Sequence, residues 1–135
     1  MREPMGVGRH ARNRAQRGAR VVAAVGGVTT VVAGLWAFFA PRSFADFAKF
    51  PPFNEHLIHD IGAFQIGIGA ALLLALVFRD GLLVALGGGA AAAVMHFISH
   101  VIDRDLGGRS LDPWLFGILA VVIGLAAFGR YRTEG

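Results

Sequence analysis

Two histidine-containing clusters lie inside apolar stretches of the chain and carry the residue types best suited to chemistry. The first contains His56, His59 and Asp60, and the second contains His96 and His100. In each cluster two metal-capable side chains are four residues apart, so they share one face of a helix. Imidazole and carboxylate groups are ligands for zinc, iron, copper and manganese. Because ionisable groups at membrane depth are costly and usually functional, these clusters are the strongest signal in the sequence.

The elements that must position these clusters are apolar and long. The chain has 135 residues, of which 55% are hydrophobic and 16% are charged, and its mean hydropathy is +0.57. This composition is too apolar for an ordinary soluble domain, and the apolar runs fit membrane spans of about 20 residues. The length predicts a single domain. The absence of cysteine excludes disulfides, thiolate metal ligands and a thiol nucleophile.

We predict an all-α fold, an integral membrane four-helix bundle. A flexible basic tail covers residues 1–20, and the membrane domain covers residues 21–135, with spans at about 21–40, 55–78, 82–102 and 113–129. Residues 42–54 are expected to form a short interfacial helix or turn, with Asn54 and Asp112 capping the helices that follow them. The first run is also compatible with a signal peptide, but it is longer than a typical signal core of about 7–15 residues, which favours a retained helix.

The distribution of basic residues predicts the orientation. Nine cations lie on one predicted side of the membrane: Arg2, Arg9, Arg12, Arg14, Arg17, Arg20, Arg79, Arg130 and Arg132. Four lie on the other: Arg42, Lys49, Arg104 and Arg109. The positive-inside rule then predicts that both termini are cytoplasmic. Because orientation explains the net charge of +4, we predict no nucleic-acid partner.

The two histidine clusters are expected to meet. The predicted helices 55–78 and 82–102 are joined by a very short turn, Arg79-Asp80-Gly81, so they should be antiparallel neighbours. His56 is then level with His100, and Asp60 is level with His96. These four residues are predicted to hold one transition metal ion near the outer leaflet, either zinc, iron, copper or manganese. Glu55, His59 and Asp103 are expected to orient the metal-binding imidazoles through hydrogen bonds, or to complete a second metal position.

Three alternatives to this metal site stay open. The histidines of the first cluster lie near the interface, where water and lipid head groups can satisfy them. A hydrogen-bonded network of histidine and aspartate without metal would satisfy the four buried groups. Two histidines on different helices can also be axial ligands of a haem, although faces rich in glycine and alanine predict a close approach that suits a bare ion better. No nucleophile–base pair, phosphate loop or dinucleotide motif is present, so whether the protein is an enzyme stays open.

The stretch from Phe53 to Ala63, followed by the later His-x-x-x-His, resembles a group of small four-helix membrane proteins common in actinobacteria. These proteins are DoxX-like in size and layout. The resemblance is carried by Asn54, Glu55, His56, Asp60, Gly62, His96 and His100. His59 stands where the group often has arginine. The resemblance implies the fold and the site, and it implies no reaction.

Together these observations predict a multi-pass protein of a bacterial plasma membrane that binds a transition metal ion near its outer face. The ion would support redox or hydrolytic chemistry on a lipid-soluble substrate. The alternatives are a structural or accessory subunit of a larger membrane complex, a haem- or quinone-type redox protein, and a small transporter. A homo-oligomer is compatible with each of these functions.

Overall fold

The fold is described from a computed structural model, which describes residues 5–78 and 81–134. These residues form five helices, α1 (Met5–Phe39), α2 (Pro41–Ala48), α3 (Glu55–Val77), α4 (Leu82–Ile102) and α5 (Asp112–Glu134), and no strand lies among them. The all-α prediction is therefore confirmed. Four helices are long and apolar enough to cross a membrane, which indicates a multi-pass membrane protein.

Local sequence signals account for the starts of α2 and α3. Asn54 caps α3 as predicted, since its side-chain oxygen accepts a hydrogen bond from the Leu57 amide at 3.1 Å. The segment predicted to form a short interfacial helix or turn is helical over part of its length: α2 begins at Pro41, whose fixed φ suits a first helical turn. The predicted turn residues Arg79 and Asp80 lie outside the described residues.

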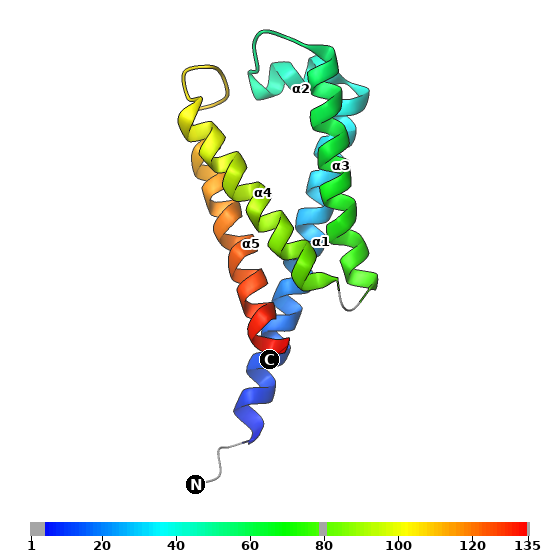
Figure 1. Cartoon of the computed structure of the whole chain (residues 1–135), viewed down its shortest axis with the longest axis vertical. Helices are drawn as coiled ribbons and strands as arrows, with labels where there is room; N and C mark the ends of the chain where they lie inside the picture. The colour runs from blue at the N-terminus through cyan, green and yellow to red at the C-terminus, as the bar shows by residue number, and fades with distance from the viewer. Residues whose placement is uncertain (1–4, 79–80, 135) are drawn as a thin grey trace.

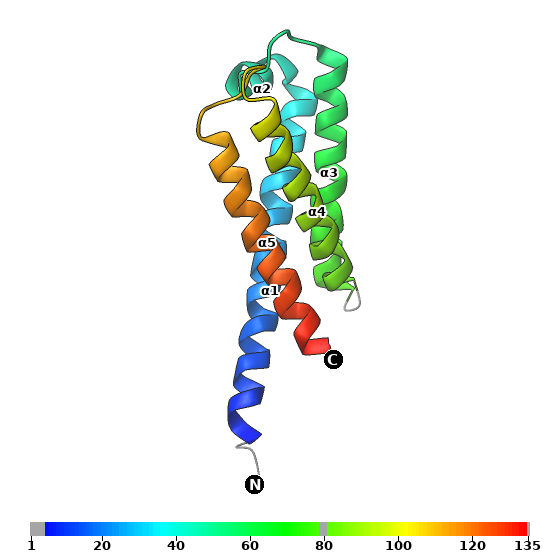
Figure 2. The same cartoon turned by 60° about the vertical axis from the view of Figure 1, so that its left-hand side comes forward.

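The two ends of the chain are more helical than predicted. α1 begins at Met5 instead of near residue 21, so the tail predicted to be flexible is helical over its described part. α5 continues to Glu134 instead of ending near Gly129. With 35 residues, α1 is about 52 Å long, well beyond a hydrocarbon core of about 30 Å. Figures 1 and 2 show its first turns extending past the rest of the bundle.

The helices are arranged as two pairs, α1 with α3 and α4 with α5 (Figures 1 and 2). Glycines seven residues apart hold the first pair together. An added Cβ at Gly34 would lie 2.8 Å from the Gly62 carbonyl oxygen, and one at Gly69 would lie 2.7 Å from the Gly27 carbonyl oxygen. Small residues at these positions allow the two backbones to approach closely.

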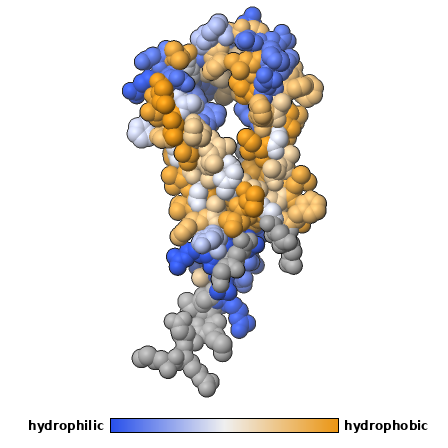
Figure 3. Space-filling view, viewed as in Figure 1, coloured by the Kyte–Doolittle hydropathy of each residue, from blue (hydrophilic) through white to orange (hydrophobic). Residues whose placement is uncertain are grey.

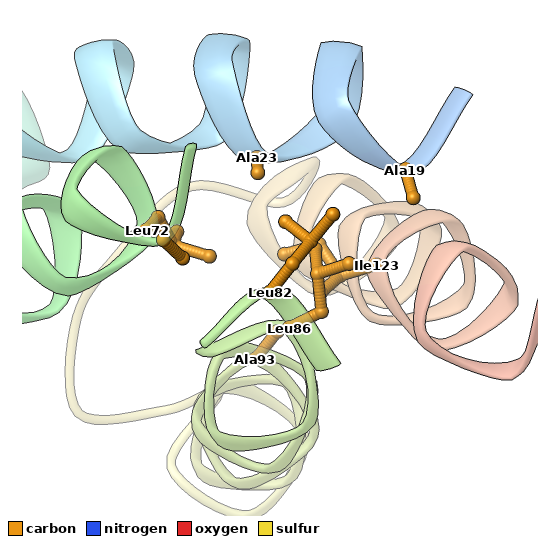
Figure 4. Close-up of a cluster of buried hydrophobic side chains, with 8 residues drawn as sticks. Ala19, Ala23, Leu72, Leu82, Leu86, Ala93 and Ile123 are labelled. Carbon is orange, nitrogen blue, oxygen red and sulfur yellow. The ribbon is translucent and has the colours of Figure 1, made fainter. Parts of the chain in front are cut away.

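The two pairs meet in the half of the bundle nearest the connection between α3 and α4. A buried cluster there draws residues from all four long helices, as Figure 4 shows: Ala19, Ala23, Leu72, Ala75, Leu82, Leu86, Ala93 and Ile123. In the other half, α3 and α4 diverge in both ribbon views (Figures 1 and 2). The short connection makes these helices neighbours at one end only.

Loops rejoin the two pairs at the far end. α2 packs on the end of α1, where the Trp36 ring lies 4.8 Å from the Phe47 ring. The loop between α4 and α5 then docks on this segment: the Gly108 amide donates to the Lys49 carbonyl at 2.8 Å, and the Arg109 guanidinium donates to the Phe47 carbonyl. The same guanidinium lies 3.6 Å from the centre of the Phe47 ring. We call this contact between Gly108–Arg109 and Phe47–Lys49 the loop latch.

Candidate functional site

The first histidine cluster lies on the surface of α3. His56 Nε2 is 3.7 Å from Asp60 Oδ2, so the predicted spacing does bring these two side chains together. Their side chains are 88% and 53% exposed, respectively. His59 lies apart from them, with its ring 5.2 Å from the Phe38 ring of α1. The first cluster is therefore largely exposed, and its one described ring contact is with α1.

The second cluster forms a stacked arrangement between α4 and α5. The His96 and His100 rings are nearly parallel, with an interplanar angle of 7°, and their Nε2 atoms are 3.0 Å apart. For this contact to be a hydrogen bond, one Nε2 atom must donate and the other must accept. Phe116 of α5 stacks on both rings, with centroid distances of 4.0 Å to His96 and 4.7 Å to His100.

A carboxylate lies close to this stack. Asp112, the first residue of α5, accepts a hydrogen bond from the Arg109 amide at 2.7 Å through Oδ2. An added Cβ at Gly108 would be 3.4 Å from this oxygen and 3.4 Å from His100 Nδ1. Gly108 of the loop latch therefore lies beside both Asp112 and His100.

The predicted four-residue metal site is wrong. Across residues 5–78 and 81–134, no group of three or more histidine, cysteine, aspartate or glutamate side chains is arranged to hold a metal ion. The pairs His56–Asp60 and His96–His100 each form, but the two pairs do not combine into one site. The reason is that α3 packs mainly against α1 and diverges from α4 in the half of the bundle that contains both pairs (Figure 1). The predicted metal-dependent function required this combined site, so that prediction is also wrong.

The residues expected to support the metal lie at separate places. Glu55 is in the first turn of α3 and borders a pocket beneath α2, and Asp103 caps the end of α4 through its backbone. His59 contacts Phe38 as described above. The identity of any cofactor, whether zinc, iron, copper, manganese or haem, stays a prediction from the sequence.

The divergence of the two pairs leaves an opening. Figure 3 shows it as a gap between the α3 side and the α4 side, in the half of the molecule that carries α2. Next to the loop latch lies a pocket of about 440 Å³, which is within the usual range of about 300–1,000 Å³ for small-molecule sites. Its walls are Arg42, Ala45, Asp46, Lys49, Phe50, Pro51, Phe53, Gly107 and Gly108.

The pocket combines charge with an aromatic rim. Arg42 and Lys49 supply two cations and Asp46 supplies one carboxylate, while Phe50 and Phe53 supply apolar surface. The Arg42 guanidinium lies 4.3 Å from the centre of the Phe53 ring, a cation–π distance. Such an arrangement suits a polar group attached to an apolar body.

The sequence analysis missed several residues of this region. Phe116 and Arg109 come from α5 and the loop before it, and no spacing rule connects them to the histidines. Asp112 was predicted only as the N-cap of the last helix, whereas in the structure it is the first residue of α5 and its side chain accepts a hydrogen bond from the Arg109 amide. The pair Gly107-Gly108 was the sequence signal that could have indicated the contact between this loop and Lys49. In the structure both residues have positive φ (146° and 85°), and an added Cβ at Gly107 would be 2.7 Å from the Lys49 carbonyl oxygen, so glycine is favoured at both positions. Adjacent glycines in a short loop indicate such a close backbone approach.

Comparisons with known proteins identify no relative: no family model, no curated protein and no solved structure matches the chain. The resemblance to DoxX-like proteins therefore stays a prediction from the motif residues.

Proposed function

We propose that this membrane protein binds one amphiphilic molecule taken from the lipid bilayer. The apolar part of the ligand occupies the opening between the two helix pairs, and its polar head occupies the pocket beside the loop latch. The observation that carries the proposal is the divergence of α3 from α4 in the half where the loops rejoin the pairs (Figures 1 and 3). Lipid-soluble molecules reach such an opening sideways from the bilayer.

The charges of the pocket indicate the chemistry of the head group. Arg42 and Lys49 favour phosphate or other acceptor oxygens, whereas Asp46 favours an ammonium or hydroxyl donor. A head group that carries both a phosphate and a donor, such as phosphoethanolamine, satisfies all three side chains. A phosphocholine head group has the phosphate but no donor, so it leaves Asp46 without a hydrogen-bond partner from the ligand.

Photocrosslinking in nanodiscs tests this proposal. Phosphatidylethanolamine with a diazirine in its acyl chain should label the wild-type chain, and unlabelled phosphatidylethanolamine should compete better than phosphatidylcholine. Arg42→Ala and Asp46→Asn should reduce labelling strongly. Arg104→Ala is the matched control, because Arg104 is exposed and lines neither of the two pockets described at α2. Equal labelling of all four proteins, or labelling that tracks only bulk lipid concentration, contradicts the proposal.

We also propose that the protein resides in a bacterial plasma membrane with both termini on the cytoplasmic side. The nine-to-four distribution of cations supports this orientation. The pocket then faces the outer leaflet. Assembly into a homo-oligomer or a larger membrane complex is compatible with this arrangement and stays a prediction.

A further inference from the structure

The first turns of α1 carry an unusual density of positive charge. We define the arginine collar as Arg9, Arg12, Arg14, Arg17 and Arg20, all of which are exposed. α1 contains no acidic residue, so nothing on the helix itself neutralises the collar. Small residues between the arginines pack toward α5: Ala19 is buried, and an added Cβ at Gly129 would lie 3.9 Å from Ala15 Cβ.

The collar is fixed at one end of the bundle. α1 runs without interruption from the collar into its apolar stretch, which begins at Val21. Arg20 donates a hydrogen bond to the Leu76 carbonyl near the end of α3, at 3.1 Å, through one of its five N–H groups. Figures 1 and 2 show that α5 also ends on this side, where Arg132 is exposed. The collar therefore lies next to the apolar stretch of α1, at the end of the bundle where α5 also ends.

We propose that the arginine collar binds the head groups of anionic phospholipids in the adjacent leaflet. Guanidinium groups bind phosphates through paired hydrogen bonds, and arginines next to a membrane span attract anionic lipids. This inference is independent of the amphiphile proposed for the pocket, which lies beside α2 at the opposite end of the bundle.

Helix geometry separates an inner tier of the collar from an outer tier, with Arg14 between them at about 10 Å from Val21. With a rise of 1.5 Å per residue, Arg20 and Arg17 lie within about 6 Å of Val21, a depth that corresponds to the head-group layer. Arg9 lies about 18 Å from Val21, beyond direct contact with a head group. Arg9 and Arg12 act on the lipids only through a field that salt screens over about 8–10 Å. The inner tier should therefore account for most of the lipid binding.

Nanodiscs made from phosphatidylcholine and phosphatidylglycerol test the proposal with the full-length chain. Native mass spectrometry counts the phosphatidylglycerol molecules that stay with the protein after release from the disc. The wild-type chain should retain phosphatidylglycerol above its share of the bilayer. This wild-type measurement needs no variant and so cannot be confounded by misfolding; retention at the bulk share overturns the proposal.

Two double variants with the same loss of charge separate the tiers. Arg17→Gln with Arg20→Gln should lower the affinity for phosphatidylglycerol about thirtyfold. Arg9→Gln with Arg12→Gln should change it only a few-fold, and this change should vanish at high salt. Equal losses in the two variants contradict direct head-group contact.

The same discs distinguish other occupants of the collar. A fluorescent single-stranded DNA and a polyglutamate peptide are offered to protein in pure phosphatidylcholine discs at physiological salt. We expect only weak, salt-sensitive binding of either. If one of them binds tightly while phosphatidylglycerol shows no enrichment, the collar serves a soluble polyanion and the lipid proposal is wrong.

Discussion

Replacing Gly62 by alanine is expected to weaken the α1–α3 pair. An added Cβ at this position would lie 2.8 Å from both the Gly34 carbonyl oxygen and the Phe38 amide nitrogen. Ordinary contact begins at 3.4 Å, so the two helices must separate by several tenths of an ångström. Overpacking of this kind typically costs about 1–3 kcal/mol. The neighbouring contact between Gly27 and Gly69 belongs to the same interface and would be loosened by the same movement.

Gly67 offers a matched control on the same helix. It is exposed, and an added Cβ there meets nothing within 4 Å. Gly67→Ala should therefore be neutral or slightly stabilising, because alanine favours the helix over glycine by up to about 1 kcal/mol. The two variants should differ by about 2 kcal/mol, or about thirtyfold in the unfolding equilibrium.

Unfolding in mixed micelles with increasing dodecyl sulfate, followed by circular dichroism and tryptophan fluorescence, measures this difference. The double variant Gly34→Ala with Gly62→Ala should lose less stability than the sum of the single variants, because one separation of the helices accommodates both methyl groups. If Gly62→Ala and Gly67→Ala unfold at the same dodecyl sulfate fraction, glycine contacts do not hold the α1–α3 pair together.

Three further expectations concern the loop latch and the topology. Arg109→Ala removes the hydrogen bonds to the Phe47 carbonyl and the cation–π contact, so it should increase amide exchange in the loop and α2, whereas Arg104→Ala should not. Asp112→Ala should cost about 1 kcal/mol by removing the acceptor of the Arg109 amide, and equal stability of this variant and wild type would contradict that role. A periplasm-specific reporter fused after Gly135 should be inactive; an active reporter would refute the proposed orientation.

The elements of the fold could be predicted because their signals are local. Apolar length identifies the spans, and the Asn54 cap and the short helix α2 follow from residue types within a single turn. The extension of α1 to Met5 was missed because arginines and glycines interrupt the apolar pattern without breaking the helix.

The pairing of the helices was harder to predict. The short connection predicted that α3 packs along α4, and the small residues of both helices were consistent with a close approach of this pair. In the structure, Gly62 and Gly69 of α3 face α1, while an added Cβ at Gly87 or Gly88 of α4 meets nothing within 4 Å. The equal seven-residue spacing of Gly27–Gly34 and Gly62–Gly69 was the informative signal, because only matching spacings bring two glycine positions into register.

The site shows the same limit. The spacing of His96 and His100 predicted their contact, since four residues apart means one helix face. It could not reveal Phe116, which depends on how α5 packs against α4. Contacts within a helix follow from residue spacing. Contacts between helices depend on which helices pair, and the same sequence pattern is compatible with more than one pairing.

The division into two helix pairs has a consequence for biogenesis. Each pair consists of two successive spanning helices, because α3 is the next candidate span after α1 and α5 is the next after α4. Because membrane helices form individually before they associate, the two pairs can assemble as separate units that dock late. Docking requires only the shared apolar cluster at one end and the loop latch at the other. Two co-expressed pieces, residues 1–80 and 81–135, are therefore expected to find each other in the membrane and restore the native arrangement without a covalent connection.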